Sequence, residues 1–412
     1  MPSALYYIII AICLLEYAYD VLIYKLNRKA SKNPIPEELV GLYDADAYAR
    51  QQEYGRMRSR LGLIDSTVGT VVLLSLFSTG CFGIFDGWVS AGFEGAVLQA
   101  LAFFGIIFLL SWLPEQPFGI YSTFNIEAKF GFNRTTPKTY ALDIVKELLL
   151  SVIMGGGILS LLVWLYGLMP DIFWIVAWGA MTIIMLFMQY IYSDVIVPLF
   201  NKQTPLEEGE LRSAIQQFAD KVGFKLKDIY VIDGSKRSSH ANAYFTGYGA
   251  RKRIVLYDTL MEQLTTEEIV GVLAHEIGHY KHGHIWRGII SSLLTNLVMF
   301  LMLGWVLDSV EIAQAAGADR ASFHVNIMVF SLLYTPLSVV LGIVDAFISR
   351  RHEWQADEFA RQHGVGTHVA SALKKMSAKS LSNLTPHPWV VKLKYSHPTL
   401  LERVRHLGCN NE

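Results

Sequence analysis

Residues 275–279 read His-Glu-Ile-Gly-His. Shortly upstream, Thr265 and Glu268 match the capping box that starts many helices, so the pattern predicts a helix through this stretch. On a helix, His275 and His279 lie one turn apart on the same face. Two imidazoles at that spacing are typical of a pair of zinc ligands. The stretch therefore predicts a zinc-binding helix.

Two other positions of this motif fit hydrolytic chemistry. Glu276 points to the side of the histidine pair, where its carboxylate can take a proton from a metal-bound water. The small Gly278 is expected to leave space beside the helix for an extended substrate. A structural zinc site needs ligands but no base, so the presence of Glu276 favours a catalytic site.

A third metal ligand is available after the next long apolar stretches. Glu353 offers a suitable oxygen, and Asp357 lies four residues later on the same face of a predicted helix. We expect Asp357 to accept the N–H of a ligating histidine. Three protein ligands and a water complete a catalytic site, so we interpret His282 and His284 as surface or substrate-side histidines. The prediction is one Zn2+ per chain.

The composition places this chemistry in a membrane. Of 412 residues, 52% are hydrophobic and only 17% are charged, which is too apolar for an ordinary soluble enzyme. Carboxylates at Glu16, Asp20 and Asp65 interrupt the first apolar segments and predict that several spans line a wet space. Seven segments are long enough, or nearly so, to cross a bilayer: 4–24, 63–83, 92–113, 147–168, 173–195, 287–307 and 325–348.

Basic residues are distributed unevenly between the loops. The alternate loops are nearly bare, with Arg320 as their one basic residue. The positive-inside rule then places the amino terminus outside and the carboxyl terminus and metal site in the cytosol. The basic residues on the cytosolic side are Lys25, Arg28, Lys29, Lys32, Arg56, Arg58, Arg60, Lys129, Arg134, Lys138, Arg350 and Arg351.

One large polar insert separates the fifth and sixth apolar segments. Within it, 207–222 is a predicted amphipathic helix, and 229–232 and 253–257 are predicted strands. The chain is thus expected to divide into membrane helices 1–198, a soluble zinc-protease domain 199–286, two further membrane helices 287–348 and a cytosolic helical region 349–412.

Three further residues are candidates for contact with a substrate. Asn242 lies between the two predicted strands, where its amide can either hold a substrate backbone or stabilise its own turn. His397 is a candidate donor to the oxyanion of a tetrahedral intermediate. Arg403 can bind a free terminal carboxylate through two parallel hydrogen bonds. Both His397 and Arg403 can also be simple surface residues.

Taken together, the chain resembles the type I CaaX prenyl proteases, a family of integral-membrane gluzincins. The resemblance covers nearly the whole chain. It implies a mainly α, polytopic fold in which seven transmembrane helices form a barrel around a large water-filled chamber, with a zinc-protease core of helices and a small β-sheet on the cytosolic side. The segments that carry it are 121–124, 126–127, 129–133, 239–245, 275–279, 349–351 with Glu353, 356–357, and 395–398 with Arg403.

The resemblance also implies a role for each candidate residue. The expected function is a zinc endopeptidase that cuts near the carboxyl terminus of CAAX-type substrates, and the expected partners are a peptide or protein, prenylated or not, and membrane lipid. The implied roles are zinc binding by His275, His279 and Glu353, proton transfer by Glu276, substrate holding near the scissile bond by Asn242 and His397, and binding near the substrate's carboxyl end by Arg403.

Alternatives from other classes stay open at this point. The sparse loops are typical of a bacterial member, which favours the bacterial inner membrane over the endoplasmic reticulum and a wider task in membrane-protein quality control. A smaller, stress-induced membrane zinc protease family has about four spans and leaves the first three segments unexplained. A noncatalytic scaffold or transporter with structural zinc is the third option. A net charge of -1, with no basic tract interleaved with aromatics, gives no support for nucleic-acid binding.

Overall fold

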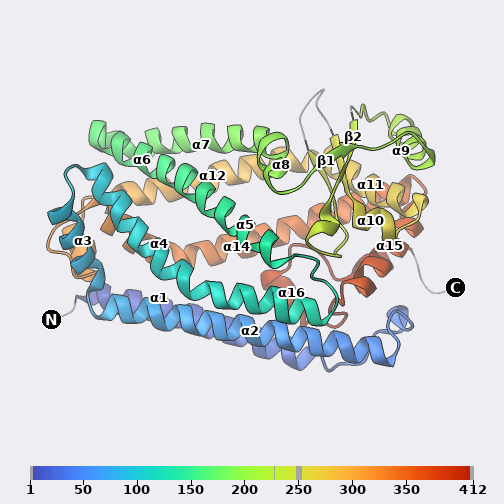
Figure 1. The fold of residues 1–412 in the computed structure, drawn as a ribbon, viewed down its shortest axis with the longest axis horizontal. Helices are drawn as coiled ribbons and strands as arrows, with labels where there is room; N and C mark the ends of the chain where they lie inside the picture. Colours follow the sequence, from blue (N-terminus) through green and yellow to red (C-terminus); the bar gives the residue numbers. More distant parts are fainter. Residues whose placement is uncertain (1–2, 227, 247–252, 409–412) are drawn as a thin grey trace.

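A computed structural model describes residues 3–226, 228–246 and 253–408. Long helices run along the molecule, and a lobe that contains a small sheet lies at one end, close to helices from the carboxyl-terminal part of the chain (Figure 1). We call this end the protease lobe; it comprises 203–281 and 366–406.

Seven helical stretches are long and apolar enough to cross a membrane, and each overlaps one predicted segment. Several continue beyond the apolar segment because a helix keeps its backbone hydrogen bonds satisfied as it leaves the bilayer. The stretches are Ala4–Ala30 (α1), Ala45–Ser78 (α2), Ala96–Glu127 (containing α4, Ala96–Tyr121), Pro137–Leu168 (α5, Pro137–Leu150, and α6, Gly156–Leu168), Pro170–Phe200 (α7, Phe173–Ile191, and α8, Val197–Phe200), His284–Val306 (α12) and Phe323–Gln362 (α14).

Three of these stretches contain a π-helical turn, at Ser122–Glu127, Ser151–Gly155 and Tyr192–Ile196. Such turns insert an extra residue into the helical repeat and are frequent at functional sites. The turn Ser122–Glu127 leads directly into a loop that contacts the protease lobe, as described below.

The sheet has four strands in the order β1-β2-β4-β3. The predicted strands at 229–232 and 253–257 are confirmed as its central, parallel pair, with Ile229 opposite Ile254 in the buried core. β3 is antiparallel to β4 and forms an edge of the sheet. The strands are β1 (Gln203–Pro205), β2 (Asp228–Ile232), β3 (Ala243–Thr246) and β4 (Arg253–Tyr257).

Shorter helices surround the sheet and close the opposite end of the molecule. The helix predicted at 207–222 is confirmed as α9 (Glu210–Lys221). Helix α11 contacts α9, α14, α15 and β3, so it lies at the centre of the protease lobe. The remaining helices are α3 (Cys81–Gly92), α10 (Asp258–Gln263), α11 (Thr266–Lys281), α13 (Val310–Ala315), α15 (Gly366–Lys379), α16 (Pro388–Lys394) and α17 (Leu400–His406).

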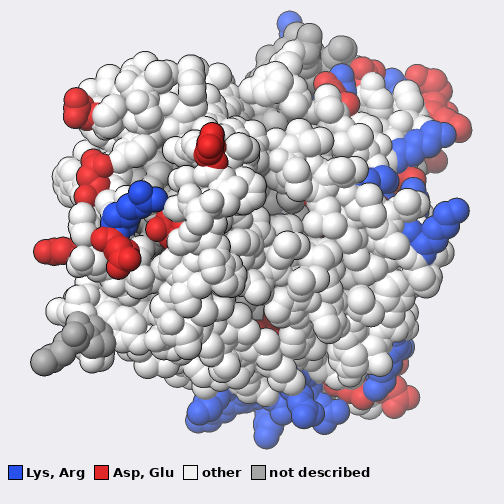
Figure 2. Space-filling view, turned by 60° about the vertical axis from the view of Figure 1, so that its left-hand side comes forward, with Lys and Arg blue, Asp and Glu red and all other residues white. Residues whose placement is uncertain are grey.

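The surface carries the pattern expected of a membrane protein. Figure 2 shows a broad face without charged side chains, with Lys and Arg gathered beyond its edges. Large apolar side chains on the spanning helices are exposed, including Ile153, Ile183 and Trp305. An apolar surface of this extent is stable only in contact with lipid or another apolar partner.

Candidate active site

Helix α11 starts at a fully formed capping box, as predicted. Glu268 donates its backbone N–H to Thr265 Oγ1, and the Glu268 carboxylate accepts the Thr265 backbone N–H at 2.9 Å. The same buried carboxylate accepts hydrogen bonds from Ser371 Oγ at 2.7 Å and Lys375 Nζ at 2.9 Å. Burial raises the pKa of Glu268, but the bonds from Lys375 and Ser371 outweigh it and hold this pKa below its usual range. The first turn of α11 is therefore fixed to α15.

Two glycines allow α11 to approach its neighbours closely. A Cβ on Gly278 would lie 3.0 Å from Ala356 Cα in α14, and a Cβ on Gly271 would lie 2.9 Å from Val369 N in α15. The expectation that Gly278 leaves space for substrate is therefore wrong, because this residue is buried against α14. Its small size instead brings the side chains of α11 and α14 together.

The three predicted metal ligands converge where these helices meet. Ligand atoms of His275, His279 and Glu353 lie within 4.8 Å of one another. His275 Nε2 and His279 Nε2 are 3.1 Å apart, and each lies 3.3 Å from an oxygen of Glu353. Glu353 is buried, and its Oε2 has no hydrogen-bond partner among the described residues. An orphaned carboxylate oxygen beside two imidazole nitrogens fits a zinc ion, which takes this donor set.

Asp357 lies behind the first histidine. Its Oδ1 is 2.8 Å from His275 Nδ1, and Asp357 itself has no exposed surface. Burial lowers the pKa of the metal-free His275 imidazole, but the nearby carboxylates of Asp357 and Glu353 outweigh this effect and raise the pKa to about 9. The contact directs Nε2 of His275 towards the cluster.

Arg403 is buried and reaches Asp357 from α17. Its Nε donates to Asp357 Oδ2 at 2.8 Å and its Nη2 donates to Asp357 Oδ1 at 2.6 Å. The third nitrogen, Nη1, lies 3.5 Å from Glu353 Oε2. The two parallel bonds expected for a substrate carboxylate are thus already formed within the protein. The alternative of a simple surface arginine is wrong, since only 8% of Arg403 is exposed.

The second ligating histidine also has a buried partner. His279 Nδ1 lies 2.9 Å from His284 Nδ1, and His284 Nε2 lies 2.8 Å from Gln355 Oε1. Gly283 adopts a positive φ of 68° that ends α11 and turns the chain back towards the site. The interpretation of His284 as a surface or substrate-side residue is therefore wrong, whereas His282 is exposed as expected.

Glu276 and His397 are the accessible groups at the cluster. Glu276 is half-buried, and among the described residues its carboxylate has no hydrogen-bond partner. His397 is well exposed, with Nδ1 at 2.9 Å from Ser396 Oγ and Nε2 at 3.4 Å from Glu353 Oε1. The Glu276 carboxylate is therefore free to accept a proton, and His397 presents a ring nitrogen to Glu353.

Asn242 is exposed and directly precedes the edge strand β3. Its Oδ1 accepts the backbone N–H of Ala243 at 2.9 Å, and its backbone carbonyl accepts the N–H of Tyr257 at 3.1 Å. The side-chain oxygen thus stabilises its own segment, which is one of the two roles predicted for Asn242. The amide NH2 group remains available to a peptide bound along β3.

The segment before Asn242 is fastened to the membrane helices. Ser239 N donates to Phe132 O at 3.1 Å, and Arg134 N donates to Arg237 O at 3.0 Å. The Arg237 guanidinium forms two bonds with Asp143 of α5, at 2.7 and 2.8 Å. The loop after the π-helical turn Ser122–Glu127 and the segment before β3 therefore form one connected unit.

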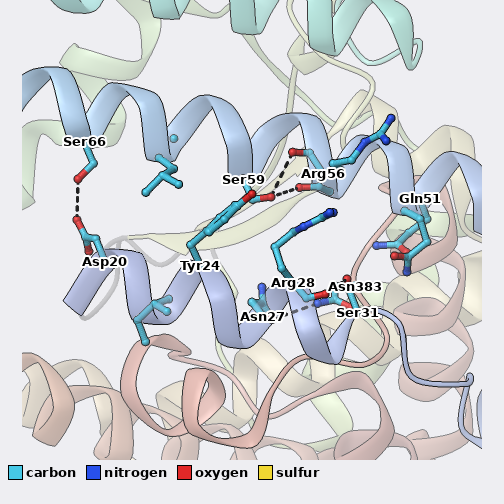
Figure 3. A pocket seen from close by; sticks show the side chains of 15 residues that line it. Asp20, Tyr24, Asn27, Arg28, Ser31, Gln51, Arg56, Ser59, Ser66 and Asn383 are labelled. Carbon is cyan, nitrogen blue, oxygen red and sulfur yellow. Dashed lines mark hydrogen bonds between the residues drawn. The ribbon is translucent and has the colours of Figure 1, made fainter. Parts of the chain in front are cut away.

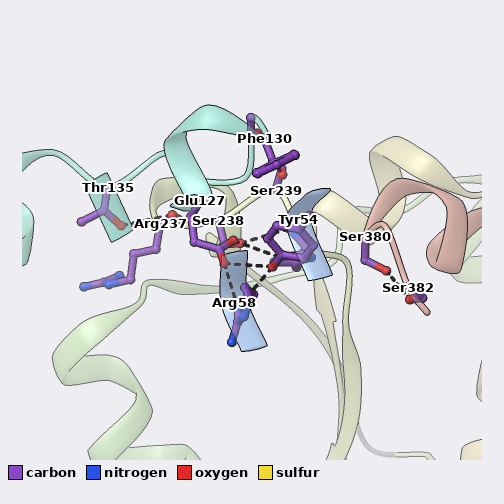
Figure 4. Close-up of polar contacts among 12 residues, drawn as sticks. Tyr54, Arg58, Glu127, Phe130, Thr135, Arg237, Ser238, Ser239, Ser380 and Ser382 are labelled. Carbon is purple, nitrogen blue, oxygen red and sulfur yellow. Dashed lines mark hydrogen bonds and ion pairs between the residues drawn. The ribbon is translucent and has the colours of Figure 1, made fainter. Parts of the chain in front are cut away.

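Glu127, the last residue of that π-helical turn, is at the centre of this connection (Figure 4). Its Oε1 accepts hydrogen bonds from Tyr54 Oη at 2.9 Å and from Arg58 Nη1 at 2.7 Å, both on α2. Its Oε2 lies 3.6 Å from His240 Nε2 in the protease lobe. A single carboxylate thus links two membrane helices to the segment that carries Asn242. Glu127 belongs to the segments that carry the family resemblance, but no supporting role was predicted for it.

Seven spanning helices joined to a buried His-His-Glu cluster define a membrane-embedded metalloendopeptidase. Comparison with known proteins names its family. Residues 25–202 match the family model for the CAAX prenyl protease N-terminal region with five membrane helices, and residues 205–409 match the model for peptidase family M48. The chain belongs to the CAAX prenyl protease 1 family.

Individual relatives extend over nearly the full chain. A CAAX prenyl protease 1 homolog of Oryza sativa is 35% identical, with 97% of each chain covered. CAAX prenyl protease 1 of Saccharomyces cerevisiae is also 35% identical, with 95% of this chain and 92% of the relative covered. The crystal structure of S. mikatae Ste24p superposes with a TM-score of 0.93 at 32% identity, covering 99% of this chain and 100% of that one.

These matches confirm several predictions. The resemblance to the CaaX prenyl proteases is correct, and so is the fold class of seven membrane helices in a barrel around a chamber, with a small sheet in the protease core. The chain is an integral, multi-pass membrane protein. Membership of a metalloendopeptidase family excludes the noncatalytic scaffold and transporter as its main function.

Proposed function

We propose that the chain is a zinc-dependent endopeptidase that cleaves peptide bonds near the carboxyl terminus of prenylated CAAX-type substrates. The observation that carries the proposal is the cluster of His275, His279 and Glu353 on the same pair of packed helices as Glu276, whose carboxylate has no hydrogen-bond partner among the described residues, in a chain that matches CAAX prenyl proteases almost end to end. Held by these three ligands, one zinc ion would acidify a water molecule and polarise the substrate carbonyl.

Four residues of the chain have separate roles in the proposed reaction. Glu276 takes a proton from the attacking water and returns it to the leaving amine. His397 donates a hydrogen bond from Nε2 to the developing oxyanion. Asn242 and the edge of β3 hold the substrate backbone in an extended form. Arg403 acts through Asp357, which keeps the His275 ring in the orientation required for metal binding.

The surroundings of the site follow from the same proposal. The basic loops support a cytosolic position for the protease lobe, and a peptide or protein substrate would then enter from that side. The surrounding partner is lipid, and no basic tract suits a nucleic acid. Whether the membrane is the bacterial inner membrane or the endoplasmic reticulum stays a prediction from loop length.

The direct test compares three peptides with the purified full-length protein in detergent and zinc. We expect a farnesylated CAAX peptide to be cleaved at least tenfold faster than its unprenylated twin, since about 0.8 kcal/mol is gained for each buried CH2 group of the lipid. An unrelated peptide should be cut most slowly. Equal cleavage of all three peptides would instead favour the broader quality-control protease, and mass spectrometry of the products locates the scissile bond.

Metal binding should depend on pH because a proton occupies the site first. With a pKa of about 9, the metal-free His275 is protonated on both nitrogens at neutral pH, and one proton must leave before Nε2 can bind zinc. Because the pKa of His275 is raised, a proton competes more strongly with zinc for its Nε2. Zinc affinity should therefore increase as pH rises. If one proton is released for each zinc bound, we expect zinc affinity to increase about tenfold for each pH unit between about pH 6 and pH 8.

Calorimetry in buffers of different ionisation enthalpy counts the released protons. At least one proton per zinc is expected for the unaltered chain. Asp357→Asn removes the carboxylate that raises the pKa of His275, so it should release fewer protons at pH 7. An affinity that is constant across this pH range would contradict the predicted competition.

A further inference from the structure

A cavity of about 360 Å3 lies between α1 and α2. It exists because small side chains of α2 face α1 at this point, so that the two helices leave space between them (Figure 3). The small residues of α2 that line it are Gly55, Ser59, Gly62 and Ser66. The cavity is separate from the His-His-Glu cluster and from every residue to which we assign a role in cleavage.

Arg28 of α1 extends into the space between the two helices (Figure 3). Among the described residues its guanidinium has no carboxylate partner, although its neighbours on the lining are polar. Arg56 of α2 also belongs to the lining, and its one ionic contact within the described part of the chain is a long one, 3.9 Å to Glu53. Glu53 forms a shorter bond of 2.7 Å with Lys129. The positive charge at this end of the cavity is therefore poorly compensated.

The nearby amides add hydrogen-bond donors. The side-chain Oδ1 of Asn27 accepts a hydrogen bond from Asn383 Nδ2 at 3.4 Å. The side-chain Oε1 of Gln51 accepts one from Gln52 Nε2 at 2.9 Å. Both amides line the cavity, and because their oxygens are already bonded, their NH2 groups are available as hydrogen-bond donors to a ligand. A guanidinium and two amide donors around one space are suited to an anion with several acceptor oxygens.

Asp20, the carboxylate that lines the other end of the cavity, has polar partners of its own. Asp20 is the one carboxylate among the described lining residues, and it lies further along α1. It accepts a hydrogen bond from Ser66 Oγ at 3.0 Å and lies 3.8 Å from Lys394 Nζ. Asp20 therefore does not supply the missing counter-charge for Arg28.

The position of the cavity identifies the kind of anion. Arg28 is near the carboxyl end of the spanning helix Ala4–Ala30, next to the exposed Lys25 and Lys29, and basic residues at the end of a span are typical of the level of the lipid headgroups. Ile23 and Leu63 provide apolar lining beside the polar groups. Basic pockets between spanning helices at this depth are typical sites for anionic lipid headgroups.

We propose that the cavity between α1 and α2 binds the phosphate headgroup of an anionic phospholipid, with Arg28 as its principal cationic contact. Asn27 and Gln51 donate to the phosphate oxygens. The lipid's chains leave the cavity towards the bilayer. Because Asn27 also bonds to Asn383, a bound lipid joins α1 and α2 to the loop between α15 and α16.

The test uses the full-length protein in nanodiscs of phosphatidylcholine, with or without phosphatidylglycerol. Native mass spectrometry counts retained phosphatidylglycerol, and the melting temperature is measured in parallel. We expect one tightly retained phosphatidylglycerol per chain, and Arg28→Gln to weaken that retention by about tenfold or more. Lys29→Gln is the matched control, because it removes the same charge from an exposed position of α1 that does not line the cavity.

Two further experiments separate lipid binding from a folding defect and from binding of free phosphate. Arg28→Lys retains the charge and should recover part of the retention, which separates lipid binding from a general folding defect. Inorganic phosphate at the same concentration should neither raise the melting temperature nor displace the lipid; if it does both, the site is one for free phosphate and the lipid assignment fails. Equal losses for Arg28→Gln and Lys29→Gln would mean that diffuse surface charge is sufficient, which also overturns the proposal.

Discussion

Glu276→Gln is expected to lower kcat by about 10²- to 10⁴-fold while the chain still binds zinc. The amide has nearly the same size as the carboxylate but cannot accept the proton of the attacking water. Glu276 has no hydrogen-bond partner among the described side chains, so its replacement breaks no structural contact seen here. The loss should therefore fall on the chemical step and leave folding and substrate affinity nearly unchanged.

Three measurements separate this outcome from other causes. Zinc content by atomic spectroscopy shows whether the ligands are intact, steady-state kinetics with the farnesylated peptide give kcat and KM, and circular dichroism reports the fold. Glu267→Gln is the matched control, since Glu267 is exposed on the same helix and away from the cluster. Retention of more than about a tenth of kcat at full zinc occupancy would exclude Glu276 as the proton acceptor.

The part of the site that sequence predicts well is local in the chain. Thr265 and Glu268 are three residues apart, and the helix they start fixes His275 and His279 on one face before any tertiary contact forms. The same periodicity places Asp357 one turn after Glu353. In each case the helix alone determines the relative positions of the side chains, so the spacing of the residues in the sequence predicts them.

The contacts that sequence did not predict depend on the packing of distant segments. His284 becomes buried because Gly283 turns the chain back after α11, and Gly278 faces α14 because of how two helices pack. β1 and β3 have three and four residues, too few to show an alternation of buried and exposed positions. None of these features leaves a periodic signal along the chain.

Among substitutions outside the metal ligands, Arg403→Ala is expected to lower folding stability the most. It would remove the guanidinium that bonds both oxygens of the fully buried Asp357 carboxylate, and breaking a buried ion pair destabilises a folded protein by about 3–5 kcal/mol. Asp357 also orients His275, so zinc affinity should fall by about 10- to 100-fold. Melting temperature and zinc titration measure the two effects. Arg403→Lys keeps one charge but loses the double hydrogen bond, and it should recover both quantities only in part.

Arg405→Ala is the matched control on α17. Arg405 pairs with Glu38 at the surface, where an ion pair contributes about 0–1 kcal/mol, so its loss should barely change either measurement. A second comparison, between peptide substrates with a free and an amidated carboxyl terminus, tests the role first expected for Arg403. If Arg403 bound the substrate carboxylate, its removal would raise KM for the free acid alone and leave zinc affinity intact. Because both donors of the fork already bond to Asp357, we expect equal losses for the two substrates, in proportion to the zinc that the site no longer holds.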